Sequence, residues 1–175
     1  VDIGRAWVEH FRNTLEEMRE MTRRIYRTDG VMWAWEYPIG PETQMLAEGA
    51  PNPFQYEIHN AAYPARMARE TAQYLDEPVW AREVAWPIVL ESARFFESVC
   101  RREKDGTWGI FVEPSMGQDE RGGPNQPNYL CALYSAQYCF QIALAMAQEL
   151  RLTGLEAEME RWRAVLREGF AYRRL

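Results

Sequence analysis

Tryptophan and carboxylate side chains gather in an irregular segment at positions 29–56, the first place in the chain with residue types suited to chemistry. Trp33, Trp35 and Glu36 lie almost side by side there, among Gly and Pro residues that leave no helical period. Flat amphipathic rings are surfaces on which sugars and other hydroxylated ligands stack. The alternative interpretation is that these tryptophans plug the end of the domain, and the residues alone leave both open.

A second irregular segment, at positions 104–127, carries paired carboxylates. Asp119 and Glu120 lie in it between glycines. A carboxyl group at the mouth of a helical bundle, among aromatic rings, can have a raised pKa and act as a general acid. Glu120 is therefore the candidate catalytic acid. An acidic pair in a loop rich in Gly and Pro is also typical of a solvated turn, which is the alternative.

His59 and the three cysteines are the remaining reactive side chains. His59 stands at the start of a predicted helix, where it can bind a ligand hydroxyl or serve as a capping or core residue. The cysteines fit neither a zinc ribbon nor a C-x-x-C redox motif, which predicts a reduced, cytoplasmic protein. The sequence holds no phosphate loop and no metal-ligand cluster, so no metal or organic cofactor is predicted.

Length, composition and charge limit the class of protein. A chain of 175 residues is long enough for one domain with a real core, and its 47% hydrophobic and 26% charged residues are close to the globular average. The net charge of -6 opposes nucleic-acid binding. No apolar run reaches the roughly 20 residues that span a bilayer, so no membrane association is predicted.

Helices with apolar residues at helical spacing must position these segments. The spacing predicts one amphipathic helix over 2–28, a helical hairpin over 57–103 and a second hairpin over 128–169. Asn60 can cap the first helix of the first hairpin, and Pro87 should break or kink its second. The first helix of the second hairpin is apolar on nearly every face, which predicts burial all round. The predicted class is all-α.

Three segments, in this order and spacing, carry a resemblance to a known family: MWAWEYPIGPE, QYEIHNAAYPARMARE and WGIFVEPSMGQDE. Over about residues 30–150 the chain resembles the catalytic domain of glycoside hydrolase family 65, which includes maltose, trehalose and kojibiose phosphorylases and acid trehalases. That family belongs to the six-hairpin glycosidases. The resemblance implies an (α/α)6 toroid with its active site at one mouth, lined by the loops that lead to the inner helices.

The resemblance also implies roles for single residues. Glu120 takes the position of the general acid that protonates the glycosidic oxygen, and the Glu-Ile-His at 57–59 matches the motif that opens an inner helix. The implied residues around a glucose-like subsite are Trp35, Glu36 and His59. Trp33 and Asp119, which lie beside residues of the predicted site, are further candidates for substrate binding. The chain departs from the family at Gln118 and Arg121, so no particular disaccharide is implied.

The implied reaction is inverting cleavage of a glycosidic bond of an α-linked glucoside, by hydrolysis or by phosphorolysis. In the family, the hydrolytic base and the phosphate-binding loop both lie downstream of the acid, which leaves the two reactions as open alternatives. Inorganic phosphate would be the co-substrate of a phosphorylase. The competing hypothesis is a non-catalytic helical scaffold that keeps the hairpins without the chemistry.

The number of predicted helices sets a further expectation. The chain supplies about five helical segments, and closing such a toroid needs more. We therefore expect residues 1–175 to form a partial (α/α)6 catalytic domain. Its exposed apolar helix faces would pack against the remainder of that domain or against an oligomeric partner.

Overall fold

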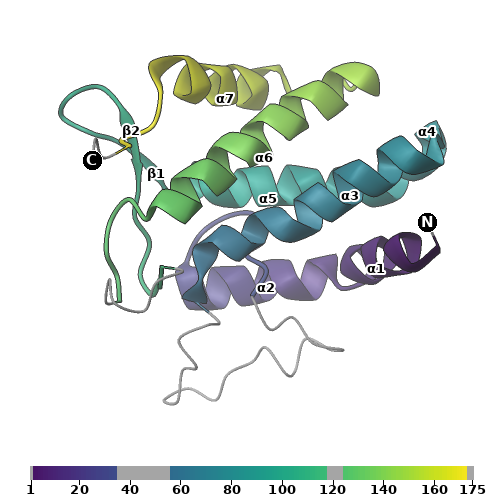
Figure 1. Ribbon diagram of the computed structural model, residues 1–175, viewed down its shortest axis with the longest axis horizontal. Coiled ribbons are helices and arrows are strands. Elements are labelled where there is room, and N and C mark those ends of the chain that lie inside the picture. Colours follow the sequence, from purple (N-terminus) through teal and green to yellow (C-terminus); the bar gives the residue numbers. More distant parts are fainter. Residues whose placement is uncertain (1, 35–55, 118–123, 173–175) are drawn as a thin grey trace.

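The computed structural model describes residues 2–34, 56–117 and 124–172, which form a mainly helical fold (Figure 1). The predicted all-α class is confirmed. The long helices are α1 (Asp2–Asn13), α2 (Leu15–Tyr26), α3 (Ala62–Leu75), α5 (Trp86–Val99), α6 (Leu130–Glu149) and α7 (Glu156–Glu168). Short elements are the 3-10 turn η3 (Ile58–Ala61), α4 (Pro78–Trp80), the π-turn η4 (Ala81–Ala85), β1 (Cys100–Arg102) and β2 (Trp108–Ile110).

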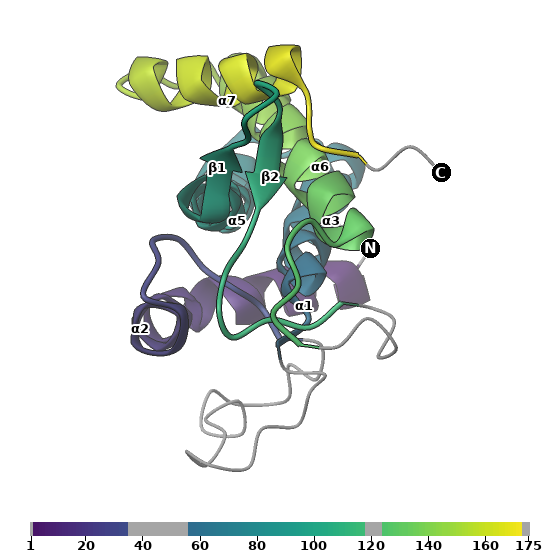
Figure 2. The ribbon, with the colours of Figure 1, turned by 90° about the vertical axis from the view of Figure 1, so that its left-hand side faces the viewer.

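The helices form two layers, with α2, α5 and α7 on one side and α3 and α6 on the other (Figure 2). Successive long segments reverse direction, so α3 and α6 run the same way and pack against each other. α5 runs opposite to them and packs on both. As a result, the segments that lead into α3 and into α6 reach the same end of the molecule (Figure 1).

The first predicted helix, 2–28, is divided at Thr14 into α1 and α2. The Thr14 hydroxyl and the Thr14 backbone N–H both donate to the His10 carbonyl, at 3.0 and 3.2 Å. A threonine hydroxyl that bonds back to the carbonyl one turn earlier bends a helix. Helical hydrogen bonding resumes at once, with the Met18 N–H on the Thr14 carbonyl at 3.0 Å. The segment is therefore two helices joined by a bend.

The break or kink predicted at Pro87 takes the form of a change of helix type, since the π-turn η4 ends at Ala85 and α5 begins at Trp86. Proline has no N–H, so the Glu83 carbonyl one turn earlier loses its helical partner. The Arg12 Nε donates to this carbonyl at 3.0 Å. The turn before Pro87 also widens, with the Trp86 N–H bonded to the Ala81 carbonyl five residues back. A contact from α1 thus compensates for the proline.

α6 lies at the centre of the fold. Fully buried alanines, among them Ala132, Ala136 and Ala143, let it pack closely against its neighbours. Burial on every face is wrong at the start of the helix, where Leu130 and Tyr134 are about half exposed. Among the described helices, α6 alone has the length and apolar composition to cross a membrane, with half of that stretch buried in the fold; a core helix passes the same test.

The start of the first irregular segment is fixed against α5. Gly30 has a φ of +77°, and a Cβ at this position would lie 2.1 Å from the Phe95 backbone nitrogen. The next residue, Val31, donates its N–H to the Glu91 carbonyl at 3.0 Å. Only glycine fits this close approach. The second irregular segment likewise begins on ordered backbone, since the Cys100↔Ile110 pair belongs to the antiparallel β1–β2 ladder.

Candidate functional site

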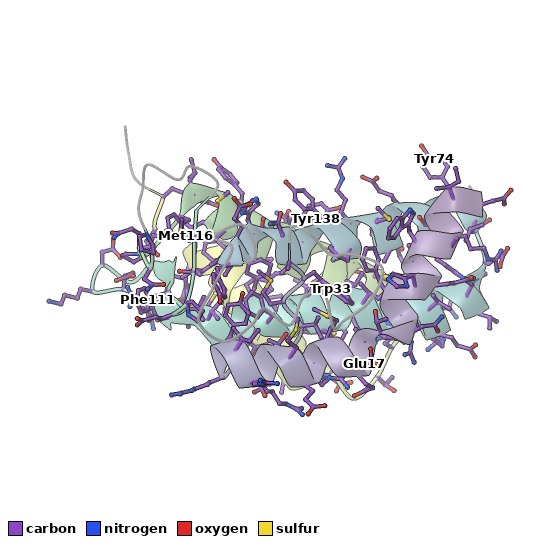
Figure 3. All side chains as sticks on the ribbon, turned by 90° about the horizontal axis from the view of Figure 1, so that it is seen from below. Glu17, Trp33, Tyr74, Phe111, Met116 and Tyr138 are labelled. Carbon is purple, nitrogen blue, oxygen red and sulfur yellow. The ribbon has the colours of Figure 1, made fainter. Side chains whose placement is uncertain are left out.

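The segments that lead into α3 and α6 touch each other at one end of the molecule. The Met116 N–H donates to the Tyr56 carbonyl at 2.8 Å, and Glu57 and Met116 form a parallel bridge. Figure 3 labels Met116 at this end, and Figure 1 shows both helices beginning there. The described ends of the two predicted site segments therefore converge, which a single binding site between them requires.

Three polar side chains are buried at this convergence, and we call them the mouth cluster: Glu57, His59 and Asn60, which are 5%, 3% and 2% exposed. Asn60 does not cap α3, since it lies within η3 and its Nδ2 donates to Glu57 Oε2 at 3.3 Å. The His59 Nε2 lies 3.8 Å from the same oxygen.

The mouth cluster holds hydrogen-bonding atoms that the described part of the chain leaves unused. Three of these atoms have no hydrogen-bond partner among the described residues: the two ring nitrogens of His59 and the Oδ1 of Asn60. Most buried polar atoms in proteins are paired, so each exception needs an explanation. One explanation is a ligand or a further segment of chain that donates to and accepts from these atoms.

His59 is uncharged at neutral pH. Burial lowers its pKa to about 4, because removing the ring from water disfavours its charged form. A neutral imidazole offers one donor and one acceptor nitrogen, which suits the hydroxyl groups of a ligand. The ring meets Tyr63 edge-on, with 6.0 Å between the ring centroids. His59 is thus a buried core residue that keeps the capacity to bind a hydroxyl.

Asn125 ties together the two described flanks of residues 118–123. Its Oδ1 accepts from the Ser115 N–H at 2.7 Å, and its own N–H donates to the Ser115 carbonyl at 2.8 Å. Asn125 has a φ of +55°, a left-handed conformation that asparagine tolerates better than most residues. The same double contact joins Asn128 to Ile110, at 2.7 and 2.9 Å. Two asparagines therefore fasten this segment to the fold.

Gly117 is required by the packing at the same flank. A Cβ on Gly117 would lie 2.5 Å from the Cδ1 of Tyr129. The Tyr129 hydroxyl in turn accepts from the Gln126 N–H at 3.2 Å. The aromatic ring before α6 thus lies over the glycine, where no side chain fits.

The structure places two of the sequence-predicted site residues, His59 and Trp33. Trp33 is fully buried, with 5.2 Å between its ring centroid and that of Phe11, and Figure 3 shows it inside the bundle. A sugar platform has to present the face of its ring to the ligand, so the described structure favours the interpretation that Trp33 fills the core. The other predicted site residues, Trp35, Glu36, Asp119 and Glu120, lie outside the described residues.

A cleft of about 620 Å³ lies away from the mouth, between α2, α5 and α7. Its centre is an ion-pair group that we call the outer cluster: Arg19, Glu91 and Arg94. Glu91 is 3% exposed and accepts from both guanidinium groups, at 3.1 and 2.8 Å. Arg94 also pairs with Glu158 of α7, at 2.8 Å. The cluster links three helices.

The outer cluster was missed by sequence reasoning. Arg19 and Glu91 lie far apart in the chain, and each looks like an ordinary solvent-facing position of an amphipathic helix. Only the packing of α2 on α5 brings them together. Because opposite charges are balanced in the cleft and largely paired, its described residues fit a structural role better than ligand binding.

The described residues form no site for metal binding or for thiol chemistry. Among residues 2–34, 56–117 and 124–172, no group of three or more His, Cys, Asp or Glu side chains is placed to hold a metal ion. The cysteines at 100, 131 and 139 form no disulfide with one another. Burial raises the pKa of Cys100 to about 12 and also raises that of Cys139, so neither thiol is activated as a nucleophile.

No protein-family model matches the chain, and no curated protein matches it. The functional assignment below therefore rests on the sequence resemblance and on the geometry of the mouth.

Proposed function

We propose that this chain is part of an α-helical carbohydrate-active enzyme that cleaves an α-linked glucoside with inversion. The observation that carries the proposal is the convergence at the mouth. The two long irregular segments, each of which holds Trp, Asp and Glu residues, lead into two parallel helices at one end, and their described flanks are bonded through Tyr56 and Met116.

The arrangement of the helices fits the finer fold that the resemblance implies. In an (α/α)6 toroid, inner helices run parallel and outer helices run the opposite way around them. α3 and α6 have the relation of two inner helices, and α2, α5 and α7 that of outer helices (Figure 2). We propose that these hairpins form one sector of such a toroid, with the mouth cluster at the substrate end.

In the proposed reaction, Glu120 protonates the glycosidic oxygen as the leaving sugar departs. In the same step, water or phosphate on the opposite face attacks the anomeric carbon, which inverts the configuration of that carbon. Asn125 and Ser115 fasten the flanks of the segment that carries Glu120. His59 donates to or accepts from a hydroxyl of the bound sugar, and Trp35, Glu36 and Asp119 complete that subsite.

Hydrolysis and phosphorolysis differ in the attacking group. Hydrolysis needs a second carboxylate, about 6.5–9.5 Å from the acid, to activate water. Phosphorolysis needs no such base, because inorganic phosphate is the nucleophile and leaves as the glucosyl phosphate. The proposal covers both reactions, and the phosphate dependence of product formation separates them.

The test is replacement of the acid by its amide in the full-length protein. Glu120→Gln should lower the rate of cleavage of maltose, trehalose or kojibiose by roughly 10²–10⁴-fold, the usual contribution of a general acid. Glu160→Gln, an exposed position on α7, is the matched control and should keep wild-type activity. Each protein is assayed with and without phosphate. Unchanged activity in Glu120→Gln contradicts the acid assignment.

A second candidate function is the non-catalytic scaffold. The burial of Trp33 favours it, because a platform for sugar is missing at that position. The two candidates differ in ligand binding: a scaffold gives no saturable change in tryptophan fluorescence with any of the three disaccharides, whereas the enzyme does.

A further inference from the structure

Three shallow hollows follow one another where α1 crosses α3. Ile3 and Trp7 line the first, Trp7, Tyr63 and Met67 line the second, and Met67 and Tyr74 line the third. Because neighbouring hollows share Trp7 or Met67, they form one continuous surface. We call it the α1/α3 face, and Figure 3 shows Tyr74 projecting outward from it.

The α1/α3 face is unusually apolar for a surface. Ile3 and Tyr74 are 78% and 81% exposed, and Trp7, Tyr63 and Met67 are between 37% and 48% exposed. Since one large aromatic side chain offers about 150–250 Å², the five expose roughly 500 Å² together, near the upper end for the largest apolar patch of a monomer. A partner is expected to cover such a patch.

The area agrees with a second copy of the chain as that partner. A contact between two such faces buries the surface of both, on the order of 1,000 Å² in total. This is the lower limit for a specific and stable interface. A homodimer through this face alone is therefore of modest affinity, and its population depends on protein concentration.

The charges of α3 are arranged so that the face complements itself. Arg66 and Glu70 lie one turn apart between Tyr63 and Tyr74, and the Arg66 Nε donates to the Glu70 Oε1 at 2.7 Å. Both side chains are at least 48% exposed. Among the described residues this is the one hydrogen bond of either charge, and both also interact electrostatically with Tyr138. The other guanidinium nitrogens and the second carboxylate oxygen can pair with a partner.

Antiparallel packing of two α3 helices uses these groups in both directions. Around a twofold axis near position 68, Arg66 of each copy faces Glu70 of the other, and Tyr63 of each copy faces Tyr74 of the other. A symmetric dimer requires this property, since each residue must find its complement in the same surface. We propose that the α1/α3 face is the interface of a symmetric homodimer.

The α1/α3 face borders the mouth cluster, since Asn60 lines its second hollow and Tyr63 meets His59 edge-on. The test therefore changes Arg66 and Glu70, to which no part in glycoside cleavage is assigned. Loss of dimerisation and loss of activity are therefore separate outcomes. If the remainder of a toroid covered this face in place of a second copy, the chain would stay monomeric at every concentration.

Sedimentation velocity over a concentration series tests the proposal with charge-reversed variants. Arg66→Glu or Glu70→Arg turns both cross-axis pairs into repulsions and should weaken the dimer by roughly tenfold or more. The double variant R66E/E70R restores both pairs and should dimerise like the wild type. An equimolar mixture of the two single variants should form a heterodimer, although each alone is weakened.

The matched controls reverse charges in the exposed Arg163–Glu160 pair of α7, which changes the net charge by the same amount. Arg163→Glu and Glu160→Arg should leave the dimer unchanged, and far-UV circular dichroism should show equal helix content in all variants. The proposal is overturned by a monomer at all concentrations. It is also overturned if Arg66→Glu and Glu70→Arg dimerise as strongly as the wild type.

Discussion

In the described part of the chain a glutamate is buried in two places, and their surroundings differ. In the outer cluster, Glu91 accepts from Arg19 and Arg94, so its charge is balanced on both sides. In the mouth cluster, Glu57 lies beside His59 and Asn60, which have neutral side chains.

The difference lies in what each cluster leaves unused. The outer cluster pairs its buried charge within the fold, as a structural group must, because an unpaired buried charge is costly. The mouth cluster keeps three buried atoms without a hydrogen-bond partner in the described chain, namely both ring nitrogens of His59 and the Oδ1 of Asn60. We therefore expect the outer cluster to contribute to stability and the mouth cluster to contribute to binding.

The largest expected effect comes from protonating the mouth cluster. The pKa of His59 is about 4 in the folded protein, whereas an exposed imidazole has a pKa of about 6.5. Between these values the unfolded chain binds more protons than the folded one, so stability is full above pH 6.5 and falls as the pH drops towards 4. The free energy of unfolding should fall by about 3 kcal/mol over this range. Urea unfolding at a series of pH values measures it.

A variant isolates the part of this loss that belongs to His59. His59→Leu removes the proton-binding ring and should abolish most of the fall between pH 6.5 and 4. At pH 7 its stability should stay within about 1 kcal/mol of the wild type, because the lost nitrogens have no hydrogen-bond partner among the described residues. An unchanged pH profile in His59→Leu would show that another group causes the loss and would remove this contrast between the clusters.

The next effect tests the outer cluster. Glu91→Gln keeps the shape of the side chain but removes the charge that two arginines share, and should cost about 2 kcal/mol in the free energy of unfolding. The partly exposed arginines recover some hydration, which keeps the cost below that of a fully buried pair. Glu160→Gln, on the exposed surface of α7, should change the same quantity by less than about 0.5 kcal/mol.

Disaccharide binding sharpens the same comparison. Under conditions in which the variant is folded, Glu91→Gln should bind the disaccharide with the affinity of the wild type. His59→Leu should bind it more weakly. The opposite result, with binding lost only in Glu91→Gln, would place the ligand in the outer cleft.

Much of the fold follows from local sequence, and its exceptions have identifiable long-range causes. The apolar period of 3.6 residues predicts the amphipathic helices because one face of each is covered. It does not predict how the chain compensates for Pro87, because the donor to the Glu83 carbonyl, Arg12, comes from another helix. The bend at Thr14 escapes the periodicity, because its cause is one hydroxyl and the hydrophobic pattern is unaffected.

The site is less predictable than the fold. The convergence of the two irregular segments follows from the parallel course of α3 and α6, which no local pattern encodes. The burial of Trp33 is likewise a result of tertiary packing, because a tryptophan in a loop rich in Gly and Pro suits a platform and a core equally well. His59 is the predicted site residue whose position at the mouth the structure describes.

The smallest expected effect concerns Asn125, whose Oδ1 accepts from the Ser115 N–H and so fastens the mouth. Asn125 contributes a side-chain acceptor and tolerance of a left-handed φ, and two variants separate these properties. Asn125→Gly keeps the backbone conformation and loses the acceptor, and should cost about 1 kcal/mol. Asn125→Ala loses both and should cost about 2 kcal/mol. Because the Asn125 Oδ1 accepts from a neutral backbone N–H, most of both costs should persist at high salt in thermal unfolding; only the 3.5 Å contact from the Asn125 Nδ2 to the Glu113 carboxylate involves a charge. A strong salt dependence would mean that the mouth, like the outer cluster, is held by charge.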